Sequence, residues 1–171
     1  MLLKSLDDIL LGAAPGVGRL WLSKLRKSEN VSAMNEIEDA ELLSIHEEII
    51  RKLGRWFDKS ADKNEIGAFF VMVGKEYCAH SVPLSELTFA LNLDRKAVTE
   101  HIVEGEDLEG AHRIYALMEV ADQVGDFFFL GSYYLTKGYL EDTFVRLRKE
   151  QRLDDETLNK YFPDDFFFKD H

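Results

Sequence analysis

The chain has few of the residues that cross-link or interrupt a fold. Its 171 residues include one cysteine, Cys78, and three prolines, at positions 15, 83 and 163. A single cysteine cannot form an intramolecular disulfide, and such cysteine usage is typical of a reducing compartment. The length corresponds to one domain that buries a core without disulfides or metal ions. We therefore expect a single domain over residues 1–171.

Long apolar runs and a basic N-terminal segment are also missing. No apolar stretch reaches the roughly 18 uninterrupted residues expected of a membrane-spanning helix. The first residues, MLLKSLDDILLG, carry Asp7 and Asp8 inside their apolar run and lack the basic start of a signal peptide. We expect a cytoplasmic protein of bacterial type with no membrane partner.

Positive charge is scarce. The chain has 21 basic and 32 acidic residues, which gives a formal net charge of -11. A surface this acidic repels the phosphates of nucleic acids and lipids unless a local basic face compensates. We therefore expect no nucleic-acid partner.

Catalytic and metal-binding motifs are absent as well. The segment GAAPGVG at residues 12–18 lacks the lysine of a phosphate-binding loop, and no G-x-S-x-G motif occurs. One E-x-x-H motif ends at His112, whereas a di-iron carboxylate bundle needs two. Cys78 and His80 are too few ligands for zinc. We expect no catalytic residues, no metal site and no cofactor, and we expect His46 and His112 to face solvent.

Helical periodicity, by contrast, covers most of the chain. Apolar residues recur every three or four positions over four segments, at about residues 36–58, 62–80, 83–105 and 107–149. Sustained strand alternation occurs nowhere. With short helices before residue 28 and up to Tyr161, the sequence predicts an all-α bundle of about six helices. Its core spans about residues 36–149, its last long helix is C-terminal, and a globin-like bundle is one version of this fold.

Two kinds of residue indicate where these helices begin or weaken. Asp62 and Glu65 have the three-residue spacing of a capping box, which predicts a helix start. Gly125, Gly131 and Gly138 lie inside the long C-terminal segment, and glycine destabilises a helix interior. A kink or break at one of these glycines is therefore one expectation.

The stretch VGDFFFLGSYYL, residues 124–135, is apolar on nearly every side of a helix. Such a helix lies at the centre of a bundle, contacts a second protein, or lines a hydrophobic pocket. Asp126 inside it should face a cation or the surface, because an unpaired buried carboxylate is costly. Since neighbouring positions differ by about 100°, the aromatic residues cannot all face one core. We predict a homodimer with at least two of five residues at its interface: Phe127, Phe128, Phe129, Tyr133 and Tyr134.

The segment PLSELTFALNLDRKAVTEHI, residues 83–102, also fits a DNA-binding helix-turn-helix. Asn92 can adopt the left-handed turn, and Arg95 and Lys96 stand where contacts with DNA would begin. Glu100 would fall on the recognition face, however, and the segment is not basic. A helix-turn-helix regulator therefore stays as an alternative function.

Part of the chain resembles a known family. The residues that carry the resemblance are Gly74, Ala79, Val82-Pro83-Leu84 with Leu87, Ala90-Leu91 with Arg95, and Gly138-Tyr139. In this pattern the chain is similar, over about residues 36–147, to the N-terminal domain of RsbR-type regulators, the co-antagonists of the kinase RsbT in bacterial stress signalling. Ser81 replaces the usual glycine of the turn, and we expect no phosphoacceptor or kinase output domain within these 171 residues. The resemblance implies an α-helical, dimerising input or scaffold domain without catalytic residues.

From these observations we expect a non-enzymatic signalling input or scaffold domain. It would act through protein–protein interaction, as a homodimer that also binds a signalling partner. Two alternatives remain: a helix-turn-helix regulator, and a sensor of haem or of a hydrophobic ligand. His80 or His101 would be the haem ligand of such a sensor.

Overall fold

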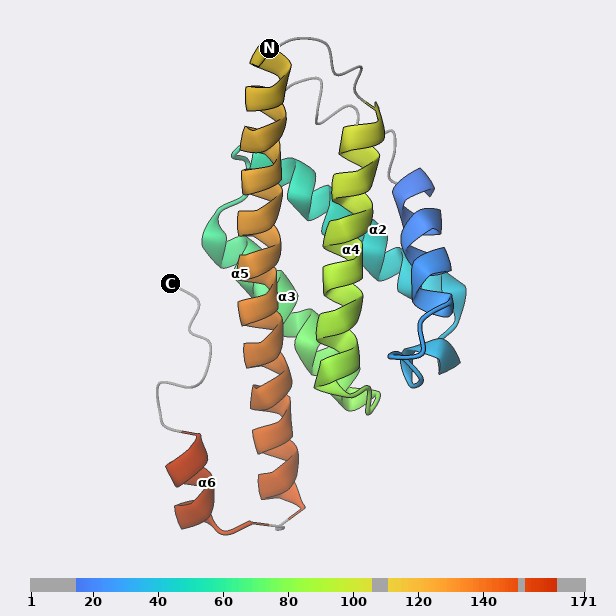
Figure 1. Ribbon diagram of the computed structural model, residues 1–171. Helices are drawn as coiled ribbons and strands as arrows, with labels where there is room; N and C mark the ends of the chain where they lie inside the picture. The colour runs from blue at the N-terminus through green and yellow to red at the C-terminus, as the bar shows by residue number, and fades with distance from the viewer. Residues whose placement is uncertain (1–14, 106–110, 151–152, 163–171) are drawn as a thin grey trace.

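The computed structural model describes residues 15–105, 111–150 and 153–162, and every regular element in these ranges is helical (Figure 1). A first helix spans residues 15–26. The elements that follow are the 3-10 turn η1 (Met34–Glu36) and the helices α2 (Asp39–Phe57), α3 (Lys63–Ala79), α4 (Leu84–Gly105), α5 (Ala111–Lys149) and α6 (Asp155–Tyr161). Over the described residues, the predicted all-α bundle of about six helices with a long C-terminal helix is confirmed.

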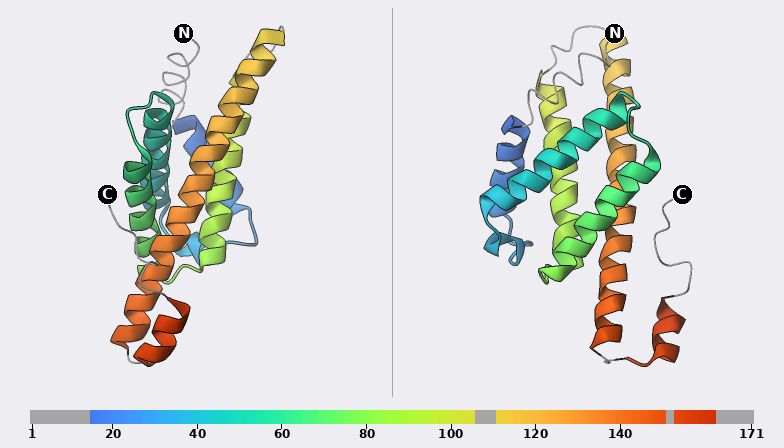
Figure 2. Two further views of the ribbon diagram at one scale, coloured as in Figure 1. Left: turned by 90° about the vertical axis from the view of Figure 1, so that its left-hand side faces the viewer. Right: turned by 180° about the vertical axis from the view of Figure 1, so that it is seen from behind.

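The four long helices form two layers. α2 and α3 run in roughly opposite directions in one layer, and α4 and α5 do so in the other (Figures 1 and 2). The most extensive contact between the layers is that of α3 with α5. The first helix lies beside α4, where the indole N–H of Trp21 donates to the Ala90 carbonyl at 3.0 Å. α6 lies beside the C-terminal end of α5.

Local sequence sets the two ends of α3. The Asp62 carboxylate accepts a hydrogen bond from the Glu65 backbone N–H at 2.8 Å, so the predicted helix start is confirmed. After α3 ends at Ala79, Ser81 has a φ of 61°, in the left-handed region. Glycine adopts this conformation without steric cost, whereas serine does so at a cost. Pro83 then precedes the first residue of α4.

α5 is one helix from Ala111 to Lys149, so the expected break at its glycines is wrong. Gly138 faces α3 so closely that an added Cβ would lie 2.1 Å from the Val71 carbonyl oxygen. Gly74 of α3 faces α5 in the same way, 2.1 Å from the Leu135 carbonyl oxygen. These glycines let two helix backbones touch, and that contact offsets their low helix propensity.

The core lies between the two layers. Phe70 of α3 and Phe127 of α5 are fully buried there, edge to face, with ring centroids 5.6 Å apart. The buried cluster also includes Val17 and Trp21 of the first helix. The core therefore extends N-terminally beyond the predicted boundary at residue 36.

Candidate functional site

The five aromatic residues of the predicted interface all lie on α5, and the structure divides them between two environments. Phe127 and Phe128 are buried in the core. Phe129 and Tyr133 point outward, with exposed fractions of 78% and 57%, and Tyr134 is half-buried against α3. A second protein can therefore contact Phe129 and Tyr133. Phe127 and Phe128 cannot belong to an interface, because they already pack inside their own chain.

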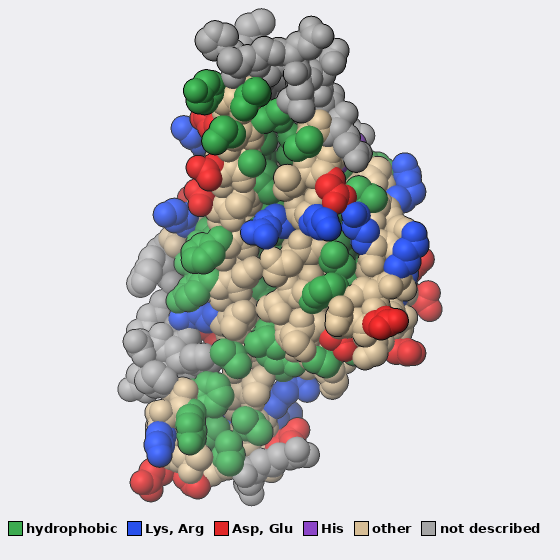
Figure 3. Space-filling model, viewed as in Figure 1, with side chains coloured by type: hydrophobic (Ala, Val, Ile, Leu, Met, Phe, Trp, Pro, Cys, Tyr) green, Lys and Arg blue, Asp and Glu red, His purple; other side chains and the backbone are tan. Residues whose placement is uncertain are grey.

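Exposed side chains continue along the same side of α5. Met118, Asp122 and Asp126 are exposed and, at about 100° per residue, lie within about 60° of Phe129. Asp126 thus faces the surface, as expected. Hydrophobic side chains appear at several points along α5 in Figure 3. We call this surface the outer face of α5 and define it by eight residues: Tyr115, Met118, Asp122, Gly125, Asp126, Phe129, Tyr133 and Lys137.

α4 does not have the geometry of a helix-turn-helix. It is a single helix from Leu84 to Gly105, and the Asn92 side-chain amide donates to the Thr88 carbonyl at 2.9 Å. A helix-turn-helix needs a turn at Asn92, so the helix-turn-helix interpretation of residues 83–102 is wrong. Glu100, on the predicted recognition face, is bound by Lys24 of the first helix at 2.8 Å.

Arg95 and Lys96 instead line a groove between α4 and α5. The groove has a volume of about 420 Å³, and Val124 and Gly125 of α5 also line it. None of its lining residues is acidic, histidine or cysteine. Gly125 connects this groove to the outer face.

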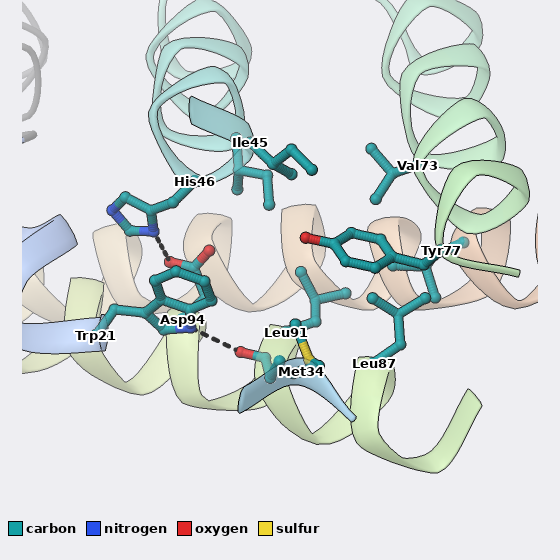
Figure 4. Close-up of a pocket in the computed structure, with 12 residues that line it drawn as sticks. Trp21, Met34, Ile45, His46, Val73, Tyr77, Leu87, Leu91 and Asp94 are labelled. Carbon is teal, nitrogen blue, oxygen red and sulfur yellow. Dashed lines mark hydrogen bonds and ion pairs between the residues drawn. The ribbon is translucent and has the colours of Figure 1, made fainter. Parts of the chain in front are cut away.

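A buried polar pair, His46 and Asp94, lies inside the bundle. His46 is 1% exposed, so its predicted solvent-facing position is wrong. Its Nδ1 lies 3.1 Å from Asp94 Oδ1, and its ring stacks on Trp21 with centroids 5.1 Å apart (Figure 4). Burial raises the pKa of the Asp94 carboxyl, and the imidazole of His46 partly offsets that rise. The pair joins α2, α4 and the first helix.

The sequence contained a signal for this burial. His46 follows Leu42 by four residues and precedes Ile49 by three, so it falls on the apolar face of α2. Asp94 likewise lies four residues before the buried Val98 on α4. A histidine and an aspartate on two apolar helix faces can form a buried ion pair with each other. A prediction from residue type alone places both at the surface and misses this pair. The side chain of His112 lies outside the described residues.

The cavity beside the pair is too small for a ligand. It measures about 20 Å³, which is room for about one water molecule and not for haem. Tyr77 points into it in Figure 4, and most of the remaining lining is apolar. His80, one of the two haem-ligand candidates, follows the last residue of α3 and is half-exposed beside Glu41. In the described ranges, no three residues among His, Cys, Asp and Glu are grouped to hold a metal ion.

Comparison of the chain with protein-family models, with curated proteins and with solved structures finds no match in any of the three. In the described part of the chain, no helix is both long enough and apolar enough to cross a membrane. Two features thus stand out: a buried His–Asp pair without a substrate cavity, and an exposed aromatic face on α5.

Proposed function

We propose that this chain is a non-enzymatic regulatory domain that binds protein through the outer face of α5. The observation that carries the proposal is Phe129, which is 78% exposed in the middle of a helix whose opposite side forms the core. Tyr133 lies one turn further along the same face. Each square ångström of apolar surface left in water costs about 25 cal/mol, a cost that a bound partner removes.

The composition of the outer face also suits protein binding better than catalysis. Aromatic residues and methionine are enriched at protein interfaces, whereas small-molecule sites are concave. Here Met118, Phe129 and Tyr133 lie on a convex helix surface, with charged residues beside them. The resemblance to RsbR-type regulators supports the same class, an input or scaffold domain of cytoplasmic bacterial signalling. Binding at this face would then shift the packing of α5, which is how a signal could be passed on.

A photoreactive phenylalanine analogue placed at position 129, in the native host, tests the proposal. We expect irradiation to give covalent protein adducts, because a partner covers this position. The matched control carries the same analogue at Val145, which is 51% exposed on the same helix and about 160° around it. Equal adduct yields at both positions, or no adduct at 129, would contradict the proposal.

A further inference from the structure

We infer that the partner on the outer face is a second copy of this chain, bound antiparallel about a twofold axis near Phe129. This inference rests on the proposed function and adds the identity and orientation of the partner. In such a pair, residues equally far from the axis, one before it and one after it, meet across the interface. The chemistry of the outer face can therefore be checked pair by pair.

Charge complementarity is the first supporting observation. Asp122 lies seven residues before Phe129, and Lys137 lies eight residues after it. Among the described residues, neither has an ion-pair partner in its own chain. Both lie on the same flank of the outer face, so Asp122 of one copy meets Lys137 of the other. Because of the twofold symmetry, the dimer contains two equivalent Asp122–Lys137 ion pairs.

The next residues inward are complementary in the same way. Asp126 lies three residues before Phe129, and Tyr133 lies four residues after it, again on that flank. Across the axis the Tyr133 hydroxyl can donate to the Asp126 carboxylate of the second copy. A parallel pair would instead place Asp122, which lies within about 20° of Phe129 around the helix, against Asp122 of the second copy, and facing like charges destabilise an interface. The charges therefore favour the antiparallel arrangement.

Gly125 supplies an observation of a different kind. An added Cβ would meet Phe70 at Gly131 or Val71 at Gly138, but at Gly125 it would meet nothing within 4 Å. Glycine in a helix interior costs about 1 kcal/mol relative to alanine, and no contact in the described part of the chain requires that cost at Gly125. In the antiparallel pair, Gly125 lies on the flank opposite the charges, where Ser132 of the second copy faces it. Two such small residues let the helices approach closely.

Light scattering at tens of micromolar gives the first test, and we expect the mass of a dimer. Asp122→Lys and Lys137→Asp should each weaken dimerisation at least about tenfold, because each puts like charges together. The double variant should recover most of the wild-type affinity, since it reverses both charges. Lys149→Asp, an exposed position outside the outer face, is the matched control and should change little. Failure of the double variant to recover affinity would overturn this pairing.

Spin labels test the orientation. The single native cysteine, Cys78, is first replaced by serine so that only introduced cysteines react. The Asp122–Lys137 pairing sets the axis midway between residues 129 and 130, so 23 helical rises of about 1.5 Å separate Met118 from its symmetry mate along the helices. A label at Met118→Cys should therefore lie about 34 Å from its mate. A label at Ser132→Cys should lie within about 20 Å of its mate, because Ser132 is close to the twofold axis. The two labels are then separated only by a small offset along the helices and by the distance between the two helix axes. Short distances at both positions would show a parallel pair and contradict the inference.

Two further outcomes separate this inference from the proposed function. A monomeric chain whose photoreactive position 129 still captures a different protein would refute the second copy and leave protein binding standing. The chain's own Phe166, Phe167 and Phe168 lie outside the described residues and are another candidate occupant of the outer face. If replacing these three by serine turns a monomer into a dimer, the tail occupies the face and the inference is wrong.

Discussion

The interior of the bundle and the outer face of α5 contain the same residue types in opposite situations. Inside, Gly138 gives room to the backbone of α3, and Phe127 fills the core. Outside, Gly125 borders open space and Phe129 is exposed. Because both sets lie on one continuous helix, helix propensity and residue type cannot explain the difference. The difference comes from the contacts that the described residues make, because these contacts cover the inner side of α5 and leave its outer face open.

The largest effect should come from the interior, at its buried polar pair. His46→Ala removes the one ion-pair partner that the described residues provide for the buried Asp94 carboxyl group, so we expect a loss of about 3–5 kcal/mol in the free energy of unfolding. Chemical denaturation followed by circular dichroism measures it. The double variant His46→Leu with Asp94→Leu removes both polar groups and should lose less than His46→Ala. A loss below about 1 kcal/mol for His46→Ala would show that the pair does not stabilise the fold.

Two glycines on α5 then give a matched comparison of the two sides. Gly138→Ala should cost about 3 kcal/mol, because its Cβ would collide with backbone atoms of α3 that cannot rotate away. Gly125→Ala should instead raise the stability of the monomer by up to about 1 kcal/mol, from helix propensity alone. Thermal unfolding at low protein concentration measures both. Similar losses for the two variants would remove the distinction between the sides.

The pH dependence of stability sharpens the description of the interior. Burial raises the pKa of Asp94 in the folded state above its unfolded value of about 4. The folded state therefore binds this proton more tightly than the unfolded state. The resulting stabilisation is complete below pH about 4, the unfolded pKa, and is lost as pH rises through the folded pKa. Relative to Asp94→Asn, which stays neutral, the wild type should lose stability as pH rises from about 4. A constant difference between the two proteins would contradict the raised pKa.

The smallest effect on stability should come from the outer face. Phe129→Glu should change the free energy of unfolding by less than about 0.5 kcal/mol, because the side chain contacts little of its own chain. The same substitution should abolish dimerisation, since it places two carboxylates near the twofold axis. Denaturation and light scattering on one sample separate the effects. A large loss of helix content would show that Phe129 belongs to the core after all.

The sequence predicted what depends on local spacing. Apolar residues at three- and four-residue steps predicted the long helices, and the Asp62–Glu65 spacing predicted the start of α3, because both signals act within one or two turns. The sequence did not predict which helix faces which. The burial of His46 depends on Asp94, which is far away along the chain. Gly138 was expected to weaken the helix, because the sequence does not indicate that α3 packs directly against it. The sequence also could not predict which aromatic residues of α5 face outward, because that depends on which side of α5 packs against the other helices.

The glycines between α3 and α5 limit how this molecule can move. Gly67 and Gly74 of α3, and Gly131 and Gly138 of α5, are each seven residues apart, close to two helical turns. Sliding α5 by a single turn would push a side chain into positions where only hydrogen fits. A piston-like stroke of α5 along α3 is therefore blocked. An event at the outer face can reach the rest of the bundle only as a small tilt or roll of α5 about this fixed crossing.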